Sequence, residues 1–365
     1  MGPIEPLEPR RLLAAGLLDP SFGDFGKLSF SLTSADDDRP TAVAVQPDGK
    51  LLVAGQATYD ADPRLTVERL NADGLLDPTF GSGGRFDTPD TVSRATAVLI
   101  EPDGRILVAG VSDGNVTVFR LSANGKFDPS FKLDTSIPTP IGADGTDLFV
   151  AAAPLPDGKV ALSFHQSIVR LLPSGKLDLW YTAADGGRTF PVSHNYALAA
   201  VPDGSLFAAG DQGGDVSLIK LTSTGAADTA FGEGGRVLTD LGHDDDAARG
   251  IALLAGNPLV LARSGGNIAV VRYAPTGDVY APFGDRGILR TTFGASDVAA
   301  APLTTAEGRF VVVGTTAGAG NMAAARFSGR GRFDRTFGGN GDWPSPTSAC
   351  PPSPRPPRSR PTVTW

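Results

Sequence analysis

The sequence has few of the features that mark common binding and catalytic classes. Its 365 residues include one cysteine, Cys350, so no internal disulfide can form and no Cys/His zinc spacing exists. No stretch approaches the roughly 20 apolar residues of a membrane-spanning helix. The net charge is −8, and the one basic concentration, Arg355, Arg358 and Arg360, lies in a proline-rich tail. Nucleic-acid binding is therefore not expected, because phosphate contacts need a basic face.

Glycine and proline are abundant instead, with 46 and 30 residues, which suits the tight turns of an all-β protein and argues against long helices. A short motif also repeats: Leu18-Asp-Pro-Ser-Phe-Gly returns as Leu76-Asp-Pro-Thr-Phe-Gly. The aspartate of this motif recurs every 50–58 residues, at Asp19, Asp77, Asp128, Asp178, Asp228, Asp278 and Asp334. These markers bracket six units.

Two further markers keep the same period. One is a Pro-Asp-Gly tip, first seen at Pro47-Asp48-Gly49, where proline presets φ and glycine supplies a positive φ, so the tip predicts a hairpin. The other is a basic residue, usually eight positions before the aspartate: Arg69, Arg120, Arg170, Lys220, Arg272 and Arg326. A catalytic group is needed once rather than six times. We therefore predict that the aspartate caps a turn and that the basic residue pairs with it or with a neighbouring carboxylate.

Each unit is interpreted as four strands, which in the first unit are Lys27–Leu32, Ala42–Gln46, Lys50–Gly55 and Leu65–Leu70. The first is polar and is expected to line a wet central channel, whereas the fourth alternates and is expected at the outer edge. Four-stranded units of this period predict an all-β fold, a β-propeller of about six four-stranded blades. The expected organisation is a targeting-like segment at residues 1–16, the propeller at 17–342 and a disordered tail rich in proline and arginine at 343–365.

The connections between these strands separate into two faces. The Pro-Asp-Gly tips and the Asp-x-x-Phe-Gly segments barely vary in length, and we call their side the repeat face. The remaining connections vary widely and form the variable face. Because variable loops on a rigid scaffold usually carry function, the acidic residues there are predicted to face a partner. They are Asp36, Asp37, Asp38, Asp144, Asp147, Asp244, Asp245 and Asp246.

No catalytic, cofactor-binding or metal-ligating residue is predicted from a motif. Carboxylates suit Ca²⁺, but nothing matches a known calcium loop and the clusters lie in different units, so solvated loop carboxylates are the simpler interpretation. The three histidines, His165, His194 and His243, occupy unrelated repeat positions. They could form a metal site only across units, and no pattern of supporting residues accompanies them.

The combined pattern of Leu-Asp-x-x-Phe-Gly, Gln46–Gly55 and Arg69–Gly74 resembles the delta-60 repeat family of bacterial β-propeller-like proteins over about residues 17–342. Units three and five depart from it, with Leu162-Ser163-Phe164 and Leu261-Ala262-Arg263 in place of Val-Ala-Gly. The resemblance implies exported or surface-associated proteins with no established activity.

The segment Leu7-Glu-Pro-Arg-Arg-Leu-Leu13 resembles the Leu-Glu-Pro-Arg-x-Leu-Leu motif that opens exported proteins of planctomycete-type bacteria. This resemblance also implies export to the cell surface or beyond. A capping helical turn is the alternative interpretation of the segment.

The sequence thus predicts a non-enzymatic exported or surface-associated propeller, expected to be a monomer, that serves as a binding or structural module through the variable face. Its partner would be a protein or a glycan. One alternative is a carbohydrate-active hydrolase or lyase at the channel mouth, which would need a pair of carboxylates or a metal in one unit alone. The unrepeated aromatics that could stack on a sugar there are Trp180, Tyr181, Tyr196 and Tyr280. The other alternative is a calcium-stabilised adhesion module.

Overall fold

Strands connected by turns make up the described part of the chain, which contains no helix. The computed structural model describes residues 21–24, 39–59, 62–88, 93–112, 115–131, 150–164, 167–178, 188–189, 194–292, 298–315 and 322–337. Among these residues no helix has the length and apolar character to cross a membrane. The predicted targeting segment and the Pro/Arg-rich tail, including Cys350, lie outside the described residues.

The strands pair into six antiparallel sheets within these ranges, numbered here in chain order. The first sheet contains β1 (Arg39–Val45), β2 (Leu51–Tyr59), β3 (Asp62–Leu70) and β4 (Arg85–Asp87), and the second contains β5 (Ser93–Ile100), β6 (Ile106–Ser112) and β7 (Asn115–Leu121). The third contains β8 (Val150–Pro154), β9 (Val160–Phe164), β10 (Ser167–Leu171) and β11 (Arg188–Thr189), and the fourth contains β12 (His194–Ala200), β13 (Leu206–Gln212), β14 (Asp215–Leu221) and β15 (Arg236–Thr239). The fifth contains β16 (Ala247–Leu254), β17 (Asn257–Ser264), β18 (Asn267–Arg272) and β19 (Ile288–Thr291), and the sixth contains β20 (Val298–Thr304), β21 (Arg309–Thr315) and β22 (Met322–Ser328).

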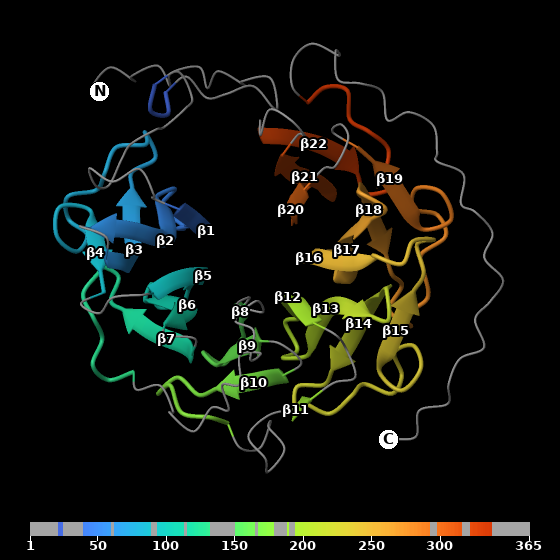
Figure 1. Ribbon diagram of the computed structural model, residues 1–365, viewed down its shortest axis with the longest axis horizontal. Helices are drawn as coiled ribbons and strands as arrows, with labels where there is room; N and C mark the ends of the chain where they lie inside the picture. Colours follow the sequence, from blue (N-terminus) through green and yellow to red (C-terminus); the bar gives the residue numbers. More distant parts are fainter. Residues whose placement is uncertain are drawn as a thin grey trace, which may run out of the picture.

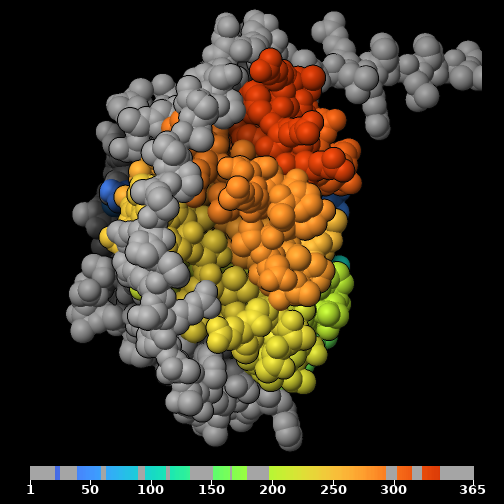
Figure 2. Space-filling view, turned by 90° about the vertical axis from the view of Figure 1, so that its right-hand side faces the viewer, coloured from blue at the N-terminus to red at the C-terminus, as the bar shows by residue number. Residues whose placement is uncertain are grey.

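The sheets stand around a common centre, as Figure 1 shows, and each runs outward from its first strand. The first strands β1, β5, β8, β12, β16 and β20 contact one another in chain order. Figure 2 shows the outer side of the fourth to sixth sheets, coloured yellow to red, stacked side by side. This arrangement of antiparallel sheets is that of a β-propeller.

The apolar core lies between neighbouring sheets rather than at one centre. Five clusters of buried side chains each join two consecutive sheets. For example, Leu52 and Val67 of the first sheet pack against Ile106 and Val108 of the second. A fold in which each unit buries its apolar surface against the next needs the same residues in every unit, which is the physical reason for the repeat.

The predicted order of strands within a unit is wrong. The strand that was expected to be the first and innermost of each unit is the fourth and outermost strand of the preceding sheet. Lys27–Leu32 lies outside the described residues, but the equivalent strands β4, β15 and β19 are outermost and pair with β3, β14 and β18. The reason is the turn before them. Phe80 N–H donates to the Asp77 carbonyl at 3.1 Å and Gly84 N–H to the Phe80 carbonyl at 2.8 Å, so the chain folds back beside the strand that it has just left.

The channel is consequently lined by apolar strands and not by the polar one. The predicted second strand is the innermost, within β1, where Val43 and Val45 remain 64% and 67% exposed. Val98, which holds the position of Val43 in the second sheet, is buried against the first sheet, so Val43 is exposed because no cluster of described side chains joins the sixth sheet to the first. Leu303 of β20 is exposed at the same junction. The predicted edge strand Leu65–Leu70 is instead buried on both faces in β3. The apolar runs therefore mark the innermost strands as well as the buried strands next to them.

The division into two faces is unaffected by this correction, because successive connections in an antiparallel sheet alternate between its two ends. The Pro-Asp-Gly tips, such as Pro47–Gly49, join the first and second strands. The Asp-x-x-Phe-Gly segments join the third and fourth strands at the same end. The turns between the second and third strands and the crossovers between sheets lie at the opposite end, which is the variable face.

The glycine of Val-Ala-Gly faces an irregularity in the innermost strand. In the first sheet the register shifts between Pro40 and Ala42, and Gly55 lies opposite Pro40. A Cβ on Gly55 would overlap the carbonyl oxygen of Arg39, so only glycine fits there. The third sheet, where Phe164 replaces this glycine, pairs β8 with β9 without a shift. The fifth sheet keeps the shift with Ala262 opposite Ala248.

Candidate functional site

The repeated charged pair is a buried structural contact, as predicted. Arg69 donates from Nε to Asp77 Oδ2 at 2.8 Å and from Nη2 to Thr79 Oγ1 at 3.1 Å. Asp77 Oδ1 in turn accepts from the backbone N–H of Thr79 at 3.0 Å and from its hydroxyl at 2.6 Å. The guanidinium carbon also lies 4.8 Å from the centre of the Phe80 ring. One arginine therefore fixes the whole turn.

The same arginine reaches into the next sheet. Arg69 Nη1 donates to the Ala123 carbonyl at 2.5 Å, and Arg120 Nη1 donates to the Pro173 carbonyl at 2.6 Å. Equivalent bonds run from Arg170 to Ser223 and from Arg272 to Gly329. We call the pairing of arginine, aspartate and neighbouring carbonyl the latch. Each of these four latches joins two sheets, so the repeated arginines tie neighbouring sheets to one another.

In the fifth unit, Arg272 and Asp278 are six residues apart and not eight, and the structure gives the reason. The backbone N–H of Tyr280 donates to the Arg272 carbonyl at 2.8 Å, just as Asp77 N–H donates to the Arg69 carbonyl at 2.9 Å. Tyr280 therefore occupies the aspartate position, and its ring lies under the Arg272 guanidinium at 4.7 Å. The prediction that Asp278 is the repeated aspartate of the fifth unit is therefore wrong. Tyr280, a candidate for sugar stacking, is a latch residue.

The latch lowers the pKa of its carboxylates. Hydrogen bonds from Ser130 and from Arg120 lower the pKa of Asp128 to about 2, although partial burial opposes the shift. Burial would raise the pKa of Asp77, but hydrogen bonds from Lys50 and Thr79 hold it well below its usual range. These carboxylates are ionised and paired, which suits structure better than proton transfer.

The acidic residues predicted to face a partner are only partly covered. Asp36, Asp37, Asp38, Asp144 and Asp147 lie outside the described residues. Asp244, Asp245 and Asp246 are described and end the crossover from β15 to β16, on the variable face.

The crossover that carries them, residues 240–246, is held in place by backbone contacts. Asp246 N–H donates to the Gly214 carbonyl at 3.2 Å, and a Cβ on Gly214 would lie 2.6 Å from the Asp244 carbonyl oxygen. Gly265 N–H donates to Asp245 Oδ1 at 2.9 Å, and Arg263 pairs with Asp245 at 3.2 Å. The segment is thus anchored to the turns of both the fourth and the fifth sheets.

Asp246 differs from its two neighbours because it is buried, with 1% of its surface exposed. Its Oδ2 accepts from Leu241 N–H at 2.7 Å and from His243 N–H at 3.4 Å, whereas its Oδ1 has no hydrogen-bond partner. Burial raises the pKa of this carboxyl, and the negative charge of Asp240 adds to the shift. The sequence analysis did not separate Asp246 from the exposed Asp244 and Asp245.

Two aspartates that the sequence analysis missed lie beside it. One carboxylate oxygen from each of Asp215, Asp240 and Asp246 lies within 4.8 Å of the others. Asp215 follows the Gly213-Gly214 turn and Asp240 follows β15, so both stand at strand ends on the variable face. A search for acids at strand ends, and not only for consecutive acids, would have found them.

The remaining sequence candidates do not assemble into a site within the described residues. His165, Trp180 and Tyr181 lie outside those residues, as do the side chains of His194 and Tyr196. His243 is described and lies against Gly265, where an added Cβ would come within 2.6 Å of its ring. The hypothesis of a three-histidine metal site is therefore untested.

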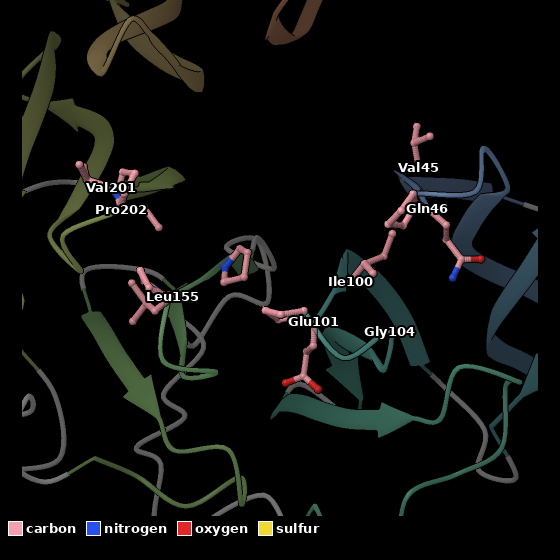
Figure 3. Close-up of a pocket in the computed structure, with 13 residues that line it drawn as sticks. Val45, Gln46, Ile100, Glu101, Gly104, Leu155, Val201 and Pro202 are labelled. Atoms are coloured by element: carbon pink, nitrogen blue, oxygen red, sulfur yellow. The ribbon is translucent and has the colours of Figure 1, made fainter. Parts of the chain in front are cut away.

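A hollow of about 590 Å³ opens on the repeat face, at the channel mouth. Its lining comes from the hairpin tips of the first four sheets and is mostly apolar, including Val45, Ile100 and Leu155. Figure 3 shows the carboxylate of Glu101 and the amide of Gln46 pointing away from the hollow. Glu101 lies 3.4 Å from Arg105 and 3.8 Å from Arg120. Its carboxylate therefore forms ion pairs within the second sheet and does not face the hollow.

Comparisons with known proteins agree with the architecture. A family model described as a domain of unknown function (DUF5122) β-propeller matches residues 46–80 and 101–131, each running from a Pro-Asp-Gly tip through the latch to the phenylalanine of the motif. No curated protein sequence matches the chain.

Solved structures with similar folds share little sequence with this chain. A protein from Lactobacillus plantarum is 16% identical, with 81% of this chain and 83% of that chain covered and a TM-score of 0.53. Sqt1 from Chaetomium thermophilum is 16% identical, with 82% and 84% covered and a TM-score of 0.49. A Bacteroides caccae protein of unknown function is 16% identical, with 70% and 88% covered and a TM-score of 0.45. The antiparallel sheets arranged around a common centre and the family match together give the chain an all-β fold of the β-propeller kind.

Proposed function

We propose that the six sheets are the blades of one β-propeller, which acts without catalysis as a binding or structural module through its variable face. One observation carries the proposal: the charges of the repeat motif are used in the latches, whereas Asp240, Asp244, Asp245 and Asp246, which take no part in a latch, gather at the crossover 240–246. Charges on the variable loops that the repeated contacts do not use are the ones available for recognition.

The crossover is suited to recognition because it is both acidic and fixed. It contains Asp240, Asp244, Asp245 and Asp246 and no lysine or arginine. Its backbone is tied to both adjacent sheets, and Arg290 donates to the Leu241 carbonyl at 3.0 Å. A preorganised loop loses little conformational entropy on binding. Charge complementarity favours a partner with a basic segment, and a glycan is the second class of ligand to test.

The geometry of the hollow supports the alternative function, a glycoside hydrolase, less well than it supports a binding or structural module. Acid-base hydrolysis of a glycoside needs two carboxyl groups facing one cavity. Glu101 is the one acidic residue among those that line the hollow, and its carboxylate points away into an ion pair with Arg105.

The test measures binding to defined probes. The chain is titrated with a decapeptide of lysine and arginine, with an acidic decapeptide and with a panel of neutral oligosaccharides. We expect binding to the basic peptide or to one oligosaccharide, and at least a tenfold loss in a variant carrying Asp244→Lys and Asp245→Lys.

The matched control carries Asp48→Lys and Asp103→Lys on the repeat face and is expected to bind as the unmodified chain does. An equal loss in the control would place binding elsewhere. Cleavage of any oligosaccharide during the titration would refute a non-catalytic function.

We also propose that the protein is exported or surface-associated, which the resemblance of Leu7–Leu13 to a motif of exported proteins supports. Fractionation of expressing cells, followed with an antibody, should recover the chain in the cell envelope or the medium. Recovery in the cytoplasmic fraction alone would contradict export.

A further inference from the structure

Three carboxylates from separate segments converge on the variable face. Asp215 begins β14, Asp240 follows β15, and Asp246 precedes β16, so the cluster joins two strands of the fourth sheet to the first strand of the fifth. One carboxylate oxygen of each lies within 4.8 Å of the other two. Like charges this close repel one another, so something must offset the repulsion.

The buried member of the cluster has an oxygen without a partner. Asp246 Oδ1 is enclosed and accepts no hydrogen bond, although Oδ2 accepts two. The buried hydroxyl of Ser264 lies near enough to lower the pKa of this carboxyl, yet that hydroxyl also has no hydrogen-bond partner. Neither Asp240 nor Asp246 forms a salt bridge within the described part of the chain. Buried carboxylate oxygens are rarely left unpaired, because burial without a partner is costly.

We propose that Asp215, Asp240 and Asp246 bind a divalent cation, and that this cation is Ca²⁺. Carboxylate oxygens are the ligands that calcium prefers, and its flexible coordination tolerates an irregular set completed by water. Zinc favours nitrogen and sulfur ligands, and none is in the cluster. The cation would occupy the position that Asp246 Oδ1 leaves unpaired.

A bound cation would tie the crossover to β14 and so brace the junction of the fourth and fifth sheets. This junction lacks an arginine latch, since Lys220 stands at the position of Arg69. The inference is independent of the proposed partner: the site could bind calcium whether or not the variable face binds anything else.

Protonation is the competing way to relieve the cluster. Burial raises the pKa of Asp246, so a shared proton could link two of the carboxyl groups. A cation and a proton are distinguished by adding calcium at fixed pH, where a proton-linked cluster would not respond.

The experiment uses the full chain after treatment with EGTA, titrated at pH 7 with CaCl₂ or MgCl₂ by calorimetry, with the thermal midpoint followed in parallel. We expect one calcium site per chain. If its Kd lies in the range of about 0.1–1 mM typical of extracellular calcium modules, 10 mM CaCl₂ should raise the midpoint by about 2–4 °C. Magnesium should give a smaller rise.

Asp240→Asn and Asp246→Asn should each weaken calcium binding at least tenfold and abolish the midpoint rise. The amide introduced by Asp246→Asn keeps an oxygen for the two N–H donors and replaces the unpaired oxygen with NH₂, so the calcium-free midpoint of this variant should equal or exceed that of the unmodified chain. Asp240 is exposed, so Asp240→Asn is a second test that does not disturb the core.

Asp245→Asn is the matched control, because Asp245 adjoins Asp246 but lies outside the cluster, and it should keep the full calcium response. No heat and no midpoint rise with calcium in the unmodified chain would overturn the proposal. An unchanged calcium response in Asp246→Asn, or equal loss in Asp245→Asn, would also overturn it.

Discussion

The latch at Arg120 gives the sharpest prediction about stability. The Arg120 side chain is 2% exposed and donates to Asp128 at 2.8 Å, to the Pro173 carbonyl at 2.6 Å and to Ser130 at 3.2 Å. Arg120→Met would leave Asp128 beside Arg105 alone, at 3.7 Å, and would leave the Pro173 carbonyl without this donor. Removing one partner of a buried ion pair costs about 3–5 kcal/mol, and the partial exposure of Asp128 places this case near the lower bound.

The fourth unit supplies the comparison. Lys220 and Asp228 pair at 2.8 Å, but their side chains are 22% and 23% exposed, and lysine has no second arm to reach the next sheet. Lys220→Met should therefore cost about 1 kcal/mol or less. Arg120→Lys, which keeps the charge but loses the fork, should cost about 1–2 kcal/mol.

The assay is urea denaturation followed by circular dichroism, with the free energy of unfolding compared among these variants. The order of loss should be Arg120→Met, then Arg120→Lys, then Lys220→Met. Equal losses for Arg120→Met and Lys220→Met, within about 0.5 kcal/mol, would refute the view that the inter-sheet arm stabilises the ring.

Three further predictions concern the same contacts. Lys220→Arg should raise the thermal midpoint, because an arginine fork can reach the next sheet where lysine cannot, and an unchanged or lower midpoint would contradict this. Folding lowers the pKa of Asp128 to about 2, so its contribution of about 2 kcal/mol is present above pH 4 and is lost as the pH falls toward 2. The thermal midpoint of the unmodified chain should fall between pH 5 and pH 2, and Asp128→Asn should reduce this fall. An equal fall in the variant would contradict the low pKa of Asp128. Gly125→Ala should cost about 3 kcal/mol in urea unfolding, because φ is +76° and the new Cβ would lie 2.7 Å from the Phe80 ring. Gly104→Ala is its control, with φ of +84° but its nearest atom at 3.8 Å, and should cost about 1 kcal/mol; equal costs would refute the packing argument.

The repeat revealed the sheets and the latch because each unit solves the same packing problem. A basic residue such as Arg69, placed eight residues before Asp77, was enough to predict their pairing. The neighbouring carbonyl, Ala123, could not be predicted, since backbone acceptors leave no trace in a sequence.

The strand order was missed because polarity was taken as the mark of the channel. The short outer strand Arg85–Asp87 carries two charged residues and is half-buried at the rim, while the innermost strand carries Val43 and Val45. Polarity alone does not distinguish a wet channel from an outer edge. The turn that includes Phe80 and Gly84 decides between them.

The acidic cluster was only partly visible for a similar reason. Asp246 was found within a run of three aspartates, but Asp215 and Asp240 are isolated in sequence and meet it only through the crossover. Burial of Asp246 follows from the close approach of the crossover to Gly214, which no local pattern encodes.

The central claim is that the repeated charges build a six-bladed ring and leave the variable face free for recognition. A crystal structure of the full chain tests it most directly. We predict six blades, with Arg39–Val45 as the innermost strand of its blade, Arg85–Asp87 at the rim and an arginine bridging to the next blade at Arg69, Arg120 and Arg170. A ring with a different number of blades, or one in which these arginines point to solvent, would contradict the claim.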